Sequence, residues 1–209
     1  MKLATLKDGT RDGRLVVVSH DLSQACSAQA VAPSLQRALD DWDRVAPALE
    51  GLYVKLNRGA LQDAFPFDPR QAAAPLPRAF QFADGSGYMH HGKLMMRAFD
   101  TENKIDFLER EPMMYQGCSD SLIGPCDDIE LADESWGIDF EGELAVITGD
   151  VPMGVSIREA GACIRLVMLV NDVSLRNLIM PELAKGFGFV QSKSASSFSP
   201  VAVTPEELG

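Results

Sequence analysis

The sequence predicts an α+β protein in which a small N-terminal hairpin-plus-helix domain precedes a larger domain rich in strands and loops. Two short segments with strand-like alternation open the chain, and a stripe of apolar residues at helical spacing follows them. After a segment rich in Ala and Pro, the second half contains two apolar runs of the kind that form buried strands. These three observations together predict the α+β fold class.

The composition is that of an ordinary globular protein, with 209 residues, 46% of them hydrophobic and 23% charged. A formal net charge of −11 argues against a nucleic-acid partner, and it is compatible with carboxylates gathered around a metal ion. The four cysteines show no CxxC spacing, which indicates reduced thiols in a cytoplasmic protein. The N-terminus lacks the apolar core of a secretion signal, and no apolar run is long enough to span a membrane.

The N-terminal hairpin is predicted from alternation in residues 2–6 and from a second apolar strand over residues 14–18. Asp8-Gly9 between them is a turn signal. Residues 34–57 then repeat apolar side chains every three or four positions, which predicts a helix packed on the hairpin. Pro47 cannot donate a helical hydrogen bond, so we expect a kink or a break there.

The domain boundary is predicted in residues 58–79, where Ala and Pro are frequent and the pattern is that of a linker. We place it near residue 72, which gives an N-terminal domain of residues 1–72 and a main domain of residues 73–209.

The main domain contains two predicted helices on either side of an apolar strand over residues 165–170. The first covers residues 156–164, where Ser156 and Glu159 have the spacing of a capping box. The second is expected at residues 175–184.

The segment IDFEGELAVITG, residues 138–149, is the most informative stretch of the main domain. Its continuous apolar run, residues 144–147, predicts a strand buried on both faces. Glu141 and Glu143 lead directly into this run. The two-residue period of a strand places both side chains on one face, about 7 Å apart. Two neighbouring buried carboxylates need a cation, for which a hard divalent metal is well suited. The alternative is a solvated strand end.

Other candidate groups lie near glycines or at the ends of apolar strands. Asp172 ends the second apolar strand, where a carboxylate serves as a metal ligand, a catalytic acid or simply a helix cap. Asp84 lies in FADGSGYMHHGK with His90 and His91, a segment that is either a ligand site or a surface loop. Lys193 is either solvated or buried beside carboxylates, where it would stabilise a developing oxyanion.

In order and local context, the segments DGSGYMHH, YQG, IDFEGELAVITG, NDVSLRN and SKSASSFSP resemble the fumarylacetoacetate hydrolase family over residues 76–209. The first 70 or so residues look like the small N-terminal domain of its bacterial members. The resemblance implies a mixed β-sandwich or β-roll catalytic domain and a homodimer. The family fold has further strands after Pro200, so we expect an incomplete domain in a C-terminally truncated chain with exposed apolar edges.

The resemblance also implies a divalent cation, Mg²⁺ or Ca²⁺, because the family's metal ligands match four carboxylates here. These are Asp84, Glu141, Glu143 and Asp172.

Four further positions match family residues that act on the substrate. His91 matches the general base that activates water, and Lys193 matches a catalytic lysine that stabilises charge near the metal. Tyr115 and Arg176 match substrate-binding residues, whereas His90 has no counterpart. The chain ends before the position of a glutamate that orients the histidine in relatives.

The function implied by the resemblance is hydrolysis of a carbon–carbon bond in fumarylacetoacetate or a related diketone or acylpyruvate acid, as in aromatic amino-acid catabolism. Ser86, Ile179 and Leu183 differ from substrate contacts of the animal enzyme, so the acyl group accepted is expected to differ. One alternative is a 2-oxo acid decarboxylase, isomerase or hydratase that uses the same metal site. Another is an inactive fragment.

Overall fold

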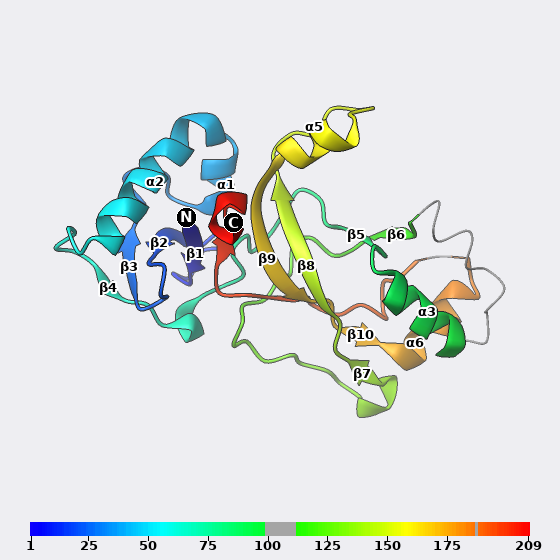
Figure 1. Ribbon diagram of the computed structural model, residues 1–209. Helices are drawn as coiled ribbons and strands as arrows, with labels where there is room; N and C mark the ends of the chain where they lie inside the picture. Colours follow the sequence, from blue (N-terminus) through cyan, green and yellow to red (C-terminus); the bar gives the residue numbers. More distant parts are fainter. Residues whose placement is uncertain (99–111, 187) are drawn as a thin grey trace.

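The computed structural model describes residues 1–98, 112–186 and 188–209 (Figure 1). The elements of the first half are β1 (Lys2–Leu6), β2 (Arg14–Val18), β3 (Gln24–Ser27), α1 (Leu35–Leu39), α2 (Trp42–Asn57), β4 (Phe65–Pro66), the 3-10 helix η1 (Pro69–Gln71), β5 (Ala83–Gly85) and α3 (Met89–Ala98). Those of the second half are β6 (Met114–Gln116), η3 (Glu134–Trp136), β7 (Ile138–Asp139), β8 (Gly142–Thr148), α5 (Ile157–Ala162), β9 (Ile164–Asn171), β10 (Ser174–Leu175), α6 (Arg176–Leu183), β11 (Ser197–Phe198), β12 (Ala202–Val203) and η4 (Pro205–Leu208). The predicted α+β class is confirmed.

The N-terminal hairpin is confirmed, because β1 and β2 pair as antiparallel strands in a register that places Leu3 opposite Val17. The helical segment divides into α1 and α2 between Leu39 and Trp42, whereas Pro47 lies inside α2. The predicted break at the proline is therefore wrong, and the kink given as its alternative stays a prediction. The two residues between the helices are aspartates, which favour helix caps over helix interiors because their side chains compete for backbone hydrogen bonds.

One sheet connects the N-terminal hairpin to the main strands, in the order β11-β9-β12-β1-β2-β3-β4, with β8 also paired to β9. The link is β12, which places Ala202 opposite Leu3 of β1 and Val203 opposite Val167 of β9. In Figure 1 this red segment lies between the blue N-terminal strands and β9. The boundary near residue 72 stays a prediction, since the sheet continues from one part of the chain to the other.

The main hydrophobic core lies between this sheet and the helices α1 and α2. It joins Leu15 of the hairpin and Leu49 of α2 to Ile147, Leu166 and Met168 of the strands β8 and β9. The core therefore holds β8 and β9 in place. Two residues of the candidate site depend on these strands: Glu143 lies in β8, and Asp172 directly follows β9.

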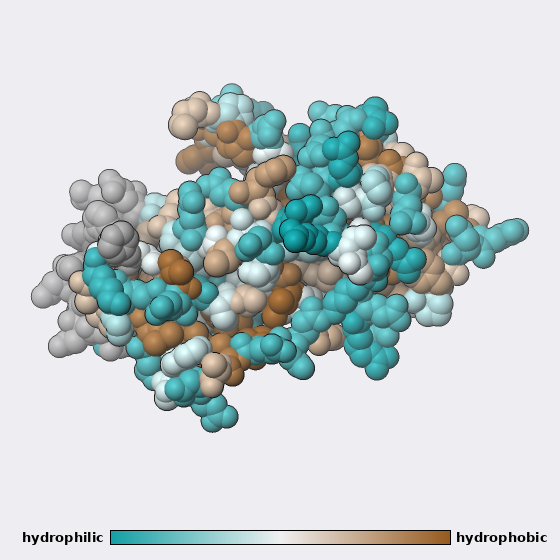
Figure 2. All heavy atoms as spheres, turned by 180° about the vertical axis from the view of Figure 1, so that it is seen from behind, coloured by the Kyte–Doolittle hydropathy of each residue, from teal (hydrophilic) through white to brown (hydrophobic). Residues whose placement is uncertain are grey.

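The strand β8 is buried on one face only, so the prediction that residues 144–147 are buried on both faces is wrong. Ile147 is 7% exposed, whereas Leu144 is 55% and Val146 is 46% exposed. Leu169, which lies opposite Leu144 on β9, is 62% exposed. An apolar run predicts a strand, but it does not reveal how many of its faces other elements cover. In Figure 2 apolar side chains also gather at the lower left of a largely hydrophilic surface.

Several smaller predictions concern local structure. The capping box at α5 is confirmed, because Ser156 and the Glu159 side chain bond reciprocally to each other's backbone. The helix predicted at residues 175–184 is α6. All four cysteines are free. Among the described residues, no helix is both long enough and apolar enough to cross a membrane.

Candidate metal centre

Two pairs of antiparallel strands position the candidate site. The β5–β6 pair places Asp84 directly opposite Tyr115. In the β8–β9 pair, Glu143 of β8 lies opposite Val170, which is one position before the end of β9. The two strand ends are also tied together, because the amide of Asp172 donates to the carbonyl oxygen of Glu141 at 2.9 Å. Carboxylates from three distant parts of the sequence therefore meet.

Asp84, Glu143 and Asp172 form a triad in which each residue offers one carboxylate oxygen within 4.8 Å of the other two. Asp172 is fully buried, and Asp84 and Glu143 are half-buried. Three carboxylates repel one another at this separation unless a cation or protons reduce their charge. The oxygen-only donor set suits a hard divalent cation, so the residues present fit the metal that the sequence pattern implies.

The electrostatics of the triad show the same repulsion. Burial, with the hydrogen bond to Asp172 and the charge of that residue, raises the pKa of Asp84 to about 6. Burial and the charges of the neighbouring carboxylates raise the pKa of Glu143 to about 7. Burial alone would also raise the pKa of Asp172, but the charge and hydrogen bond of Lys193 outweigh it and lower that pKa. Asp172 is thus the carboxylate that keeps its negative charge most strongly.

Lys193 is the cation beside the triad, and its side chain is 10% exposed. Its ammonium group donates to Asp172 Oδ2, to Glu141 Oε2 at 2.7 Å and to Ser174 Oγ at 2.8 Å. A lysine ammonium has three N–H donors, so groups of the protein occupy all of them. Burial lowers the pKa of Lys193, but the neighbouring carboxylates outweigh this effect and raise it. Lys193 is therefore held as a cation.

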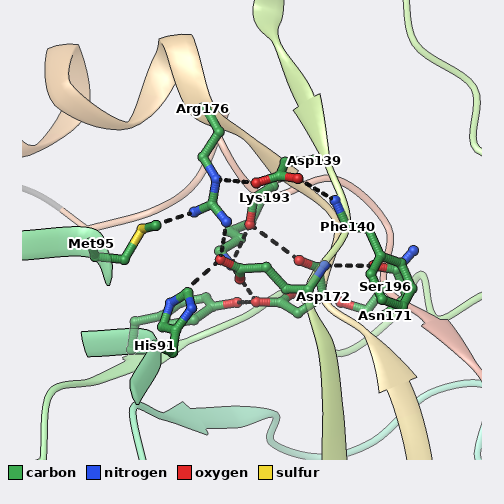
Figure 3. Close-up of polar contacts among 12 residues, drawn as sticks. His91, Met95, Asp139, Phe140, Asn171, Asp172, Arg176, Lys193 and Ser196 are labelled. Atoms are coloured by element: carbon green, nitrogen blue, oxygen red, sulfur yellow. Dashed lines mark hydrogen bonds and ion pairs between the residues drawn. The ribbon is translucent and has the colours of Figure 1, made fainter. Parts of the chain in front are cut away.

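Arg176 and His91 both lie near Oε1 of Glu141, whereas Lys193 donates to its Oε2. Figure 3 labels these three side chains around the site. The Arg176 guanidinium donates to Asp139 Oδ2 at 2.8 Å through Nε and to Glu141 Oε1 through Nη2. His91, on α3, has its Nε2 3.7 Å from the same Glu141 oxygen, and its ring is partly exposed. Glu141 thus lies between two cations and an imidazole. Burial raises its pKa, but the bonds and charges of Lys193 and Arg176 outweigh burial and lower it.

The structure brings the eight predicted site residues together, but it divides the four predicted metal ligands. Asp84, Glu143 and Asp172 form the triad, whereas Glu141 pairs with Lys193 and Arg176 and is not part of it. The assignment of Glu141 as a ligand stays a prediction. Tyr115, expected to contact substrate, donates its hydroxyl to Asp172 Oδ2 at 2.7 Å.

Sequence reasoning missed several residues that support the site. Ser196 donates to Asp172 Oδ1 at 3.1 Å, and Ser174 accepts from Lys193. Asn171 accepts from the backbone amide of Glu141 at 3.1 Å. Serine and asparagine are common in loops, so their types gave no signal. Their one signal was position, since Asn171 and Ser174 lie next to or near Asp172 and Ser196 lies three residues after Lys193.

Two family models match nearly the whole chain. "Fumarylacetoacetase N-terminal domain 2" matches residues 1–78, and "Fumarylacetoacetate (FAA) hydrolase C-terminal" matches residues 81–209. Among solved structures, a Mycobacterium smegmatis protein has a TM-score of 0.65 at 20% identity. A fumarylacetoacetate hydrolase from Exiguobacterium antarcticum has a TM-score of 0.59 at 19% identity. Each alignment covers 99% of this chain and 67% of the solved chain, and each shows likeness of fold.

Curated relatives have more than one named activity. A 2,4-didehydro-3-deoxy-L-rhamnonate hydrolase from Sphingomonas sp. (strain SKA58) is 37% identical over 102 residues, which are 47% of this chain and 35% of the relative. The human mitochondrial oxaloacetate tautomerase FAHD2A is 27% identical over 152 residues, which are 71% of this chain and 45% of the relative. The chain thus spans less than half the length of both relatives. With both family models matched and the fold shared, the chain belongs to the fumarylacetoacetate hydrolase family.

Proposed function

We propose that this chain carries the metal centre of a divalent-cation-dependent hydrolase that cleaves a carbon–carbon bond in fumarylacetoacetate or a related diketone or acylpyruvate acid. One observation carries the proposal: Lys193 joins Asp172 of the triad to Glu141, and Glu141 also pairs with Arg176 and lies near His91. This combination offers a cation site, a base and positive charge for an anionic substrate in one place.

Asp84, Glu143 and Asp172 would hold the cation, for which we propose Mg²⁺ or Ca²⁺ because the donors are all carboxylate oxygens. A cation bound there supplies a Lewis acid that polarises a chelating diketo acid. Asp172 is the most strongly held ligand, because Ser196 and Tyr115 donate to its two oxygens. A fixed carboxylate needs no rearrangement when a cation binds.

His91 is the proposed general base. Its ring is partly exposed, so water can reach it, and its Nε2 lies near the anionic Glu141. An imidazole that gains a proton becomes a cation, and the neighbouring carboxylate stabilises that charge. His91 would take a proton from water as the water oxygen bonds to the substrate carbonyl carbon. The carbon–carbon bond then breaks, its electron pair remains on the departing methylene carbon, and the proton from His91 ends there.

Arg176 is the proposed contact for the acidic end of the substrate. Its guanidinium already bridges Asp139 and Glu141, which fixes its plane next to Glu141. A guanidinium matches the geometry of a carboxylate and stays protonated. Lys193 adds a second positive charge, although its three donors are used within the protein. We therefore assign Lys193 the stabilisation of negative charge through its field.

Tautomerisation of a 2-oxo acid is a second candidate, because a relative that matches 71% of this chain is named an oxaloacetate tautomerase. Keto–enol exchange moves a proton from carbon to oxygen, so it needs a base but no water nucleophile. The same His91 and cation site would serve it. The two reactions differ in their products, since only hydrolysis releases two shorter molecules.

The test is incubation of the purified 209-residue chain with Mg²⁺ or Ca²⁺ and a panel of acylpyruvates, fumarylacetoacetate and oxaloacetate. Hydrolysis predicts loss of diketone absorbance and appearance of two acids by NMR. Faster loss of enol absorbance with oxaloacetate alone would favour the tautomerase. His91→Asn should abolish either reaction, whereas His90→Asn, which alters the neighbouring exposed histidine, should not. No turnover of any compound at micromolar protein would refute the proposal and favour the inactive fragment.

A further inference from the structure

Glu182 is a carboxylate outside the triad that collects an unusual number of donors. It lies near the end of α6 and accepts hydrogen bonds from three consecutive backbone amides. These are Val190 at 3.1 Å, Gln191 at 2.7 Å and Ser192 at 3.0 Å, and the hydroxyl of Ser192 donates as well. Successive amides that converge on one anion form a rigid concave turn. Glu182 thus fixes the conformation of residues 190–192.

The residue that follows this turn is Lys193, whose backbone is held from the opposite side. Lys193 forms an antiparallel bridge with Ser174, and the amide of Leu175 donates to the carbonyl of Ser192 at 2.8 Å. The segment is thus clamped between Glu182 and β10. A lysine side chain has four rotatable bonds, so its ammonium stays on three acceptors only if its backbone is fixed.

We propose that Glu182 is the positioning residue for Lys193: its carboxylate holds the turn at residues 190–192 and thereby keeps the Lys193 ammonium on Glu141, Asp172 and Ser174. Glu182 touches neither the triad nor any group that acts on substrate in the proposed function. It acts through residues 190–192, by way of their three backbone amides and the hydroxyl of Ser192. Its relevance to catalysis rests on the proposed function, but the geometric claim does not.

The simpler reading is that Glu182 only stabilises a surface turn. Both readings predict that Glu182→Ala loosens residues 190–192. They differ in what happens to the Lys193 ammonium. If the role of Glu182 is purely local, the ammonium stays bound to Glu141, Asp172 and Ser174 in the Glu182→Ala variant. The measurement must therefore observe the Lys193 nitrogen directly.

The test is NMR of the full chain with isotope-labelled lysine. A buried ammonium with three hydrogen bonds exchanges its protons slowly with water and gives a nitrogen–proton signal near neutral pH, and Lys193→Met assigns it by its loss. We expect the signal in the parent protein and in Glu130→Gln, which neutralises an exposed glutamate as the matched control. Glu182→Ala should abolish it. Ser192→Ala, which removes one donor, should only broaden it.

Far-ultraviolet circular dichroism confirms that each variant is folded. If Glu182→Ala does not fold, Glu182→Gln, which keeps the shape and one acceptor oxygen, replaces it with the same expectation. An unchanged signal in the folded variant would overturn the proposal, and so would a missing signal in the parent protein. The NMR result needs no substrate, so it stands apart from any failure of the proposed hydrolysis. Where turnover is measurable, Glu182→Ala should reduce kcat roughly tenfold with a smaller change in KM.

Discussion

Replacing Lys193 with methionine tests the electrostatic balance of the site. Methionine keeps most of the apolar stem and removes the charge. In the parent protein the ammonium contacts Asp172, whose side chain is 1% exposed, and Glu141, whose side chain is 8% exposed. Lys193→Met therefore leaves two buried carboxylates, one of them fully buried, without their shared counter-ion. Of these two carboxylates, the remaining cation Arg176 pairs only with Glu141 among the contacts of the described residues.

The expected loss of unfolding free energy is about 3–5 kcal/mol, the range for removal of one partner of a buried ion pair. For a chain of this size, 1 kcal/mol corresponds to roughly 2–4 °C in Tm, so Tm should fall by about 6–20 °C. Mg²⁺ or Ca²⁺ should recover part of the loss, because the cation takes over the role of counter-ion. At a concentration of about 100 times Kd this recovery is about 2.7 kcal/mol.

The assay is urea unfolding near neutral pH, with and without the divalent cation. The matched control is Lys7→Met, which breaks an ion pair with Asp127 in which the lysine side chain is 43% exposed. An exposed pair of this kind is worth about 1 kcal/mol or less. Equal losses for the two variants would refute the conclusion that Lys193 is the buried counter-ion of the site.

Three further outcomes are expected. Divalent-cation affinity should fall as the pH drops from 7 to 6, because protons then compete with the cation for Glu143 and Asp84. Burial, with neighbouring charges, raises the pKa of Glu143 to about 7, and burial, with the hydrogen bond to Asp172 and its charge, raises the pKa of Asp84 to about 6. Calorimetric affinity that is flat with pH would contradict this. Glu207→Gln should lower the unfolding free energy by about 1.5–3 kcal/mol near neutral pH. Glu207 of η4 bonds to the Tyr53 hydroxyl at 2.6 Å and to His20 Nδ1 at 2.8 Å. Burial raises the pKa of Glu207, but these hydrogen bonds lower it to about 2, so this stability is complete above about pH 4.5 and is lost as pH falls toward 2. A pH-independent difference in urea unfolding would exclude this role of Glu207. Ile147→Ala should lower the unfolding free energy by about 2–5 kcal/mol, whereas Leu144→Ala on the exposed face should lower it by less than about 1 kcal/mol. Similar losses for the two variants in urea unfolding would show that both faces of β8 are covered.

Local elements were predictable from the sequence because their signals are local. The two-residue period of β1 and β2 predicted the hairpin, and the Ser156–Glu159 spacing predicted the cap of α5. The sheet order was not predictable, because β12 joins β9 to β1, and its partner strand β1 lies at the opposite end of the chain. The burial of β8 also depends on which elements cover it.

The candidate site was predictable to the extent that side-chain chemistry and family resemblance determine it. Both pointed to the carboxylates, to His91 and to Lys193. Neither could show that Glu141 pairs with cations while Glu143 joins the triad, since the two differ only in tertiary surroundings. Glu182 was missed because its partners are backbone amides, which leave no mark on the sequence.

The central claim is that Asp84, Glu143 and Asp172 form a divalent-cation site, and calorimetric titration of the purified chain with Mg²⁺ and Ca²⁺ tests it most directly. The parent protein and Glu130→Gln should bind one equivalent with equal affinity. Asp84→Asn and Glu143→Gln should each weaken binding by at least about 100-fold, because each removes a charged ligand. Unchanged affinity in both folded triad variants, or no binding to the parent protein, would contradict the account.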